Sequence, residues 1–147
     1  MAKNAMPVSK AKTAYGLLSE IRALILEEPK RYDQTVWKRD PAMLHRGDQP
    51  TCGTICCVAG WVDQLKSDEP VPSDNPYKYG SRGGFADYEI AWRAREVLGL
   101  SMEQRDELFG AERVGPKRSH NAHAKRGAAH IARFQKKYAK QLKAKRV

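Results

Sequence analysis

The sequence predicts a mainly α-helical fold, a single domain of about five helices with a long central loop and a basic C-terminal helix. Apolar residues recur at intervals of three and four along several segments, and no segment has the alternating pattern of a strong strand. At 147 residues the chain has the length of one domain. Within it we distinguish a mobile basic arm at 1–9, a helical body at 10–113, and a basic C-terminal helix and tail at 114–147.

The first helix is expected at about 10–27, where apolar side chains keep helical spacing until Pro29 interrupts the pattern. After it, Asp33 is placed to cap one short turn. The stretch at 40–50 then has two prolines and a glycine, which are typical of a loop.

A second helix is predicted over about 53–66, because apolar residues again recur at helical spacing and Thr51 or Thr54 offers an N-terminal cap. The stretch SDEPVPSDNPYKYGSRGG that follows combines three prolines, three glycines and many small polar residues without periodicity. That composition predicts the long central loop, at 67–85.

A third helix is expected at about 86–98, with Gly99 as a left-handed C-terminal cap and Leu100 folded back over the last turn. Ser101 and Gln104 have the spacing of a capping box, which predicts the start of a short fourth helix. Both boundaries are therefore marked by local residue chemistry.

The fifth helix is expected to begin near Ser119 or Asn121 and to be amphipathic. Its apolar stripe consists of Ala124, Ala128, Ile131, Phe134, Tyr138 and Leu142. The segment also contains three histidines, His120, His123 and His130. We interpret these as surface residues of a basic helix.

Charge is distributed unevenly along the chain. Residues 114–147 hold eleven of the 27 lysines and arginines and no Asp or Glu, whereas the other 113 residues hold 16 basic and 17 acidic groups. Because uncompensated like charges repel one another, such a segment is typical of one that binds a polyanion. An acidic surface on a partner protein, or a helix face that is only solvated, would account for the same composition.

Nucleic acid is the polyanion that we expect, and because no base-reading motif is present, the contacts should be to phosphates. The predicted nucleic-acid-binding residues are Arg126, Arg133, Lys136, Lys137, Lys140 and Lys143. The predicted function is that of a small non-enzymatic accessory protein, for which no catalytic residue is assigned. The alternative among binding proteins is an inhibitor or modulator that binds an acidic surface of another protein.

The three cysteines all lie in the stretch TCGTICCVAGW at 51–61, and three explanations of them remain open. They are free thiols packed in the core, ligands of a zinc ion, or the centre of a thiol-dependent enzyme. The metal-ligand candidates are His45, Cys52 and Cys57, although zinc sites usually have a second pair of ligands. A nucleophilic Cys52 at a helix N-terminus would have its thiolate stabilised by unpaired backbone amides.

The same stretch contains the pattern CGTxxCxAGW, in which Cys52 and Cys57 are the two cysteine positions. It resembles the core of a group of small proteins encoded in phage and bacterial genomes. The resemblance implies a phage or prophage origin and a mostly helical fold, and it implies no particular activity. Cys56 is an addition to the pattern in this chain.

The expected location is the cytoplasm, in a bacterial host cell if the chain is of phage origin. No apolar run is long enough to cross a membrane, and the N-terminal stretch MAKNAMPVSKAK lacks the apolar segment of a secretory signal. An odd number of cysteines, two of them adjacent, does not suit a secreted disulfide framework. We therefore expect no membrane partner.

Overall fold

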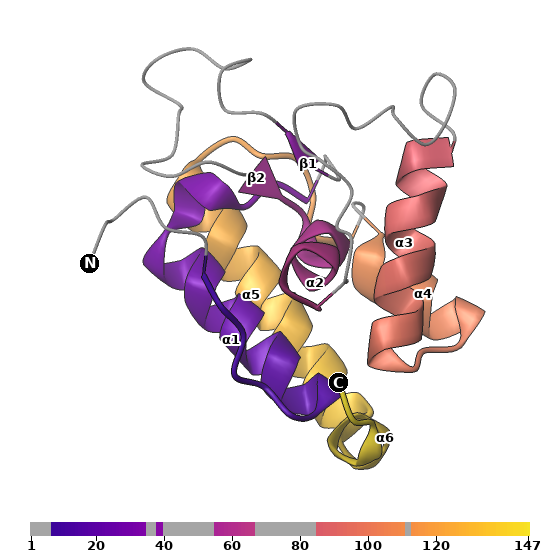
Figure 1. Ribbon diagram of the computed structural model, residues 1–147. Coiled ribbons are helices and arrows are strands. Elements are labelled where there is room, and N and C mark those ends of the chain that lie inside the picture. The colour runs from indigo at the N-terminus through magenta and orange to yellow at the C-terminus, as the bar shows by residue number, and fades with distance from the viewer. Residues whose placement is uncertain (1–6, 35–37, 40–54, 67–84, 111–112) are drawn as a thin grey trace.

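The computed structural model describes residues 7–34, 38–39, 55–66, 85–110 and 113–147. Within these ranges the chain is mainly helical, which confirms the predicted fold class (Figure 1). The elements in chain order are α1 (Ala14–Glu27), the 3₁₀ turn η1 (Pro29–Arg31), β1 (Lys38–Arg39), β2 (Ile55–Cys56), α2 (Val58–Lys66), α3 (Phe85–Leu98), α4 (Met102–Phe109), α5 (His120–Lys137) and α6 (Ala139–Ala144). Of the loop predicted at 67–85, residues 67–84 lie outside the described residues, and Phe85 is the first residue of α3.

The helices α1 and α5 lie side by side, with α2 between them and α3 in the view of Figure 1. The apolar residues of α1 that keep helical spacing are buried: Ala14, Leu17, Leu18, Ile21 and Ile25. They belong to one hydrophobic core with the predicted stripe of α5, of which Ala124, Ala128, Ile131 and Phe134 are buried. Since full burial of a Leu, Ile or Phe side chain stabilises a fold by about 1.5–3 kcal/mol, this contact fixes α5 firmly in place.

The helix α2 joins this pair to α3 and α4. Trp61 is fully buried and donates its indole N–H to the carbonyl of Arg31 at 3.1 Å. The guanidinium of Arg31 lies 4.8 Å from the centroid of the Trp61 ring, a cation–π contact. The tryptophan thus ties α2 to η1 through its ring and through its N–H.

Gly127 allows the closest approach between α5 and the chain after η1. A Cβ atom at this position would lie 2.5 Å from Cζ of Tyr32, whose side chain is fully buried. Glycine inside a helix costs about 1 kcal/mol of helix stability relative to alanine. Here glycine leaves the space that the Tyr32 ring occupies.

The two helix boundaries predicted from local chemistry are confirmed. Gly99 has φ = 67°, and the N–H of Leu100 donates to the carbonyl of Arg95 at 3.0 Å, the bond that spans more residues in a left-handed C-terminal cap. The hydroxyl of Ser101 accepts from the N–H of Gln104, whose side chain accepts in turn from the N–H of Ser101. These short-range bonds fix the turn between α3 and α4.

The predicted start of the second helix is wrong. The helix α2 begins at Val58, and the residues before it form β2, which pairs antiparallel with β1 in the register Lys38 with Cys56. The carbonyl of Cys56 also accepts from the N–H of Asp33 at 3.2 Å. Contacts with chain distant in sequence therefore overrode the local helical spacing, and the cap candidates Thr51 and Thr54 lie outside the described residues.

The C-terminus of the chain is tied to the segment that precedes α1. The N–H of Ala14 donates to the carbonyl of Lys145 at 2.8 Å, and the N–H of Val147 donates to the carbonyl of Lys12 at 3.2 Å. Leu142 of α6 is buried in the shared core. Residues 114–147 are thus anchored at both ends of α5 and form part of one domain.

Candidate polyanion-binding surface

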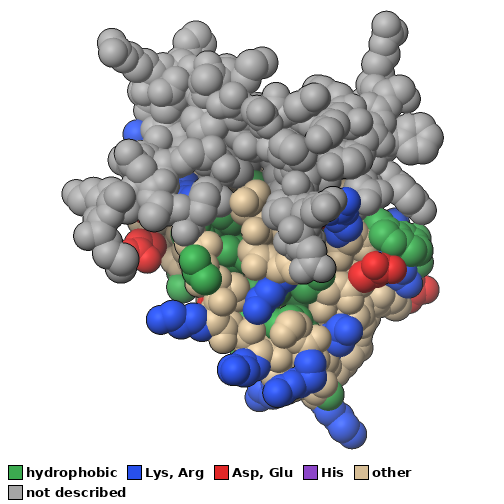
Figure 2. Space-filling view, in the orientation of Figure 1, with side chains coloured by type: hydrophobic (Ala, Val, Ile, Leu, Met, Phe, Trp, Pro, Cys, Tyr) green, Lys and Arg blue, Asp and Glu red, His purple; other side chains and the backbone are tan. Residues whose placement is uncertain are grey.

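The helix α5 has one buried face and one exposed face. Eight of its residues are buried, namely His123, Ala124, Gly127, Ala128, His130, Ile131, Phe134 and Gln135. The exposed side carries the cations Lys125, Arg126, Arg133, Lys136 and Lys137. Figure 2 shows Lys and Arg side chains gathered on the lower part of the view, where α6 and the C-terminus lie in Figure 1, with Asp and Glu side chains higher at the sides.

Three of the predicted binding residues, Arg133, Lys136 and Lys140, are exposed. None of them makes an ion pair with any carboxylate in the described part of the chain. In this part of the chain their charges are therefore compensated by solvent ions. Phosphates of a nucleic acid can displace these ions, which favours binding.

Two further predicted residues, Lys137 and Lys143, have partners within the protein. The ammonium of Lys137 lies 3.0 Å from Oε1 of Glu107, and its side chain is still 58% exposed. The ammonium of Lys143 lies 4.9 Å from the ring centroid of Tyr15. An exposed ion pair contributes little to stability. Lys137 could therefore leave Glu107 and contact another anion with little loss of folding free energy.

Arg126, the sixth predicted residue, has a structural role. Its Nε donates to the carbonyl of Val114 and its Nη2 to the carbonyl of Pro116, both at 2.9 Å. The guanidinium thereby holds the segment that leads into α5. Its binding of nucleic acid stays a prediction, with two of its five N–H donors already bonded to the backbone.

A hollow of about 390 Å³ lies between α4 and α5, and we call it the α4–α5 pocket. Its lining residues are Glu107, Arg113, His130, Arg133, Phe134 and Lys137. The carboxylate of Glu107 accepts from the hydroxyl of Tyr138 at 2.6 Å and from Lys137. These bonds, the Tyr138 bond foremost, hold the pKa of Glu107 below its usual range, so its single negative charge is present at neutral pH beside three cations.

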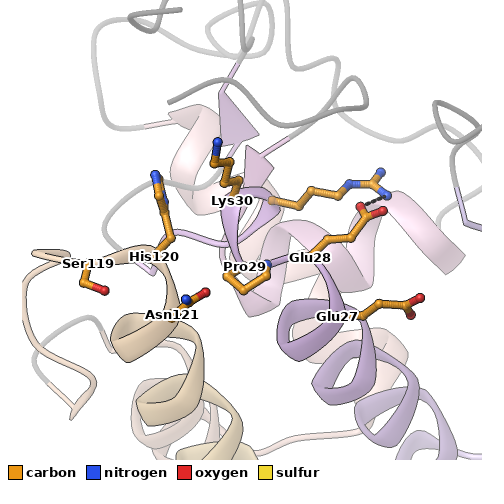
Figure 3. A pocket seen from close by; sticks show the side chains of 8 residues that line it. Glu27, Glu28, Pro29, Lys30, Ser119, His120 and Asn121 are labelled. Carbon is orange, nitrogen blue, oxygen red and sulfur yellow. Dashed lines mark hydrogen bonds and ion pairs between the residues drawn. The ribbon is translucent and has the colours of Figure 1, made fainter. Parts of the chain in front are cut away.

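A second hollow, of about 510 Å³, lies between the end of α1 and the start of α5, and Figure 3 shows its lining. The side chains of Lys30 and His120 extend to one side of it. Two carboxylates, Glu27 and Glu28, lie at its other side, and Glu28 forms an ion pair with Arg31 at 3.0 Å. This mixed lining favours neither sign of ligand charge.

The buried face of α5 contacts a polar cluster centred on Gln34, which the sequence analysis did not predict. The side-chain amide of Gln34 donates to the carbonyl of Phe109 at 2.8 Å and accepts from the hydroxyl of Tyr32 and the N–H of Val58. Its backbone N–H donates to Nε2 of His123 at 3.0 Å. Removal of this amide would leave several buried polar groups without partners, which is costly in a core.

The prediction that His123 and His130 are surface residues is wrong. His123 is fully buried and His130 is 8% exposed. Nε2 of His123 accepts a hydrogen bond, so its neutral ring carries the proton on Nδ1, whereas Nε2 of His130 lies 2.8 Å from the carbonyl of Glu107 and donates to it. Burial lowers the pKa of both. Their spacing of seven residues, with Gly127 between them, was the signal for a shared inner face.

The described cysteines are buried and fit the packing explanation. Cys57, not Cys52, occupies the N-terminus of α2, where its Sγ accepts from the N–H of Gly60 at 3.4 Å. Burial raises the pKa of Cys57 to about 12, although the backbone amides of Gly60 and Ala59 act in the opposite direction. The rise in the pKa caused by loss of solvation is therefore larger than the fall caused by the amides of the helix terminus, and the thiol stays protonated.

Zinc binding finds no support among the residues that the structure places. In that part of the chain no group of three or more His, Cys, Asp or Glu side chains is arranged to hold a metal ion. The candidates His45 and Cys52 lie outside it. Cys57, the third candidate, is buried in the core.

Comparison with known proteins assigns no family. No protein-family model, no curated protein and no solved structure matches this chain. Among the helices described, none has the length and apolar character needed to cross a membrane.

Proposed function

We propose that this chain is a small non-enzymatic protein that binds nucleic acid through the phosphates, using the exposed face of α5 and α6. The observation that carries the proposal is the state of Arg133, Lys136 and Lys140. These three side chains are exposed, make no ion pair within the described residues, and project from helices anchored in the core. A fixed array of unpaired cations attracts a polyanion more strongly than the same charges on a disordered tail, because less freedom is lost on binding.

The proposal includes a phage-type accessory role in the cytoplasm of a bacterial cell. Its support is the CGTxxCxAGW resemblance, in which Trp61 serves as the core residue that joins α2 to η1. The alternative of an inhibitor that binds an acidic protein surface uses the same cations. Nucleic acid is favoured because phosphate charge is denser than carboxylate charge on a protein surface.

The proposal is tested with a variant in which Arg133, Lys136 and Lys140 are all replaced by Gln. Binding to fluorescein-labelled 20-nucleotide DNA, as single strand and duplex, and to RNA of the same length is measured by anisotropy at several salt concentrations. The wild type should bind with an affinity that falls steeply with salt. The triple variant should bind roughly 100-fold more weakly at low salt, with the slope of log K against log salt reduced by roughly 3.

A matched control carries Gln at Lys10, Lys30 and Arg118, three exposed cations outside α5 and α6. It has the same net charge as the test variant and should keep affinity within roughly threefold of the wild type. Absence of wild-type binding to both DNA and RNA at low salt would contradict the proposal. Equal losses in the two variants would contradict the assignment of the surface.

A further inference from the structure

The α4–α5 pocket and a neighbouring hollow share one lining residue, Lys137. The neighbouring hollow, of about 440 Å³, is lined by Lys137, Tyr138, Lys140, Gln141 and Ala144. It lies where α5 ends and α6 begins, because Tyr138 separates the two helices. The cations that line one or both hollows are Arg113, Arg133, Lys137 and Lys140. We call these four residues and the two hollows the α5 groove.

The charge of the α5 groove is strongly positive. Among the lining residues that the structure describes, Glu107 is the one carboxylate, and both of its oxygens are engaged, by Tyr138 and by Lys137. Arg113 and Arg133 make no ion pair in the described part of the chain. Three positive charges therefore remain beyond the pair of Lys137 and Glu107.

We propose that the α5 groove binds consecutive phosphates of a nucleic-acid backbone, with Arg133 and Lys140 as principal contacts. This inference rests on the proposed function and narrows it, because the strand is held in a hollow on one side of α5 instead of lying anywhere on the basic face. Arginine suits such a position, since its planar guanidinium donates two parallel hydrogen bonds to one phosphate.

The lining residues distinguish the groove from the rest of the basic face. Arg133 and Lys137 are four residues apart in α5, so they lie along one side of that helix, and Lys140 of α6 lines the same hollow as Lys137. Lys136 lines neither hollow. Lys125, near the start of α5, lines neither of them as well.

The environment of His130 supports the convergence of the two guanidinium groups. Its ring lines the α4–α5 pocket, and after burial the charges of Arg133 and Arg113 also act to lower its pKa. Both groups therefore lie close enough to this ring to disfavour a third positive charge. An anion that enters the pocket would relieve the same repulsion.

The test compares three single substitutions that each remove one exposed positive charge: Arg133→Gln, Lys140→Gln and Lys125→Gln. Their affinities are measured with the labelled 20-nucleotide DNA, single-stranded and duplex, and with the labelled RNA, and the tightest-binding probe is used for the comparison. Arg133→Gln and Lys140→Gln should each weaken binding roughly tenfold, as expected for loss of a charged hydrogen bond. Lys125→Gln should weaken it less than roughly threefold.

Equal losses for all three variants, with wild-type binding intact, would overturn the α5 groove and leave the proposed function standing. Absence of wild-type binding to both DNA and RNA would overturn both, so the two failures are distinguishable. Thermal denaturation of each variant supplies the check on folding, since all three side chains are exposed.

A second measurement reports on the pocket directly. The imidazole resonances of the four histidines are followed by NMR while the unlabelled DNA is added. A shift of the His130 resonance with no comparable shift of His120, which lines the hollow of Figure 3, is the expected result. An unchanged His130 resonance at saturating DNA would overturn the proposal.

Discussion

The two faces of α5 use polar residues in opposite ways. On the inner face, His123 and Gln135 are buried and hydrogen-bonded, Gln135 to the carbonyl of Tyr15 and the hydroxyl of Ser19. On the outer face, Arg133 and Lys136 have no ionic partner in the described residues. The difference shows that one helix can hold a core together with buried, hydrogen-bonded side chains on one face and present cations without an ionic partner on the other.

The separation is expected to hold in experiment. Changes on the inner face should lower the free energy of unfolding and leave nucleic-acid affinity unchanged wherever the protein is folded. Neutralisation of outer-face cations should do the reverse. Substitutions on the inner face therefore test whether stability and nucleic-acid affinity are controlled separately.

The largest expected effect is that of Gly127→Ala. The added Cβ would lie 2.5 Å from Cζ of Tyr32, so the ring or the helix must shift, and overpacking of this kind costs about 1–3 kcal/mol. Chemical denaturation of the variant measures this loss, and the anisotropy assay should show unchanged DNA affinity at a temperature where it is folded.

A Tyr32→Ala background supplies the control for this substitution. With the ring removed, Gly127→Ala should become neutral or stabilising, because alanine favours a helix over glycine by about 1 kcal/mol. A penalty of the same size in both backgrounds would show that the close approach of Tyr32 is not its cause.

A smaller effect is expected from the buried histidines as the pH falls. The pKa values of His123 and His130 are lowered by burial, so below pH of about 6.5 the unfolded chain takes up protons before the folded one does. Stability is therefore retained above that pH and lost as the pH falls toward the folded pKa values, by up to about 1.4 kcal/mol per pH unit for each histidine. Denaturation midpoints between pH 7.5 and 5 measure this dependence.

The double variant His123→Gln, His130→Gln provides the comparison for the pH series. It is expected to be less stable at neutral pH and to lose less stability than the wild type over the acidic range. The same acidic slope in both proteins would mean that other groups account for it.

The sequence predicts well those features that nearby residues determine. Gly99 with Leu100, and Ser101 with Gln104, mark helix ends through bonds that span only a few residues, and all are found as predicted. The apolar stripe of α5 was equally clear, because burial follows from its period.

Features that depend on distant chain were missed. The start of α2 is set by β1 and by Asp33, and the burial of His123 depends on the approach of Gln34, 89 positions earlier in the sequence. For the candidate site, the sequence supplied the exposed cations. The commitment of Arg126 to backbone carbonyls and the grouping of Arg113 with Arg133 required the fold.

The smallest expected effect is on the reactivity of Cys57, a buried residue that lies outside the basic surface. With its pKa raised to about 12 by burial, the Cys57 thiol is almost wholly protonated at pH 8, and the residue is 2% exposed. In a Cys52→Ser variant, Cys56 and Cys57 should not react with an aromatic disulfide reagent at pH 8 on a timescale where the guanidinium-unfolded protein reacts completely. DNA affinity should equal that of the wild type. Rapid reaction of the folded variant would show that the thiolate is accessible and that burial does not suppress its reactivity. A thiol-dependent enzyme would then again be a candidate function.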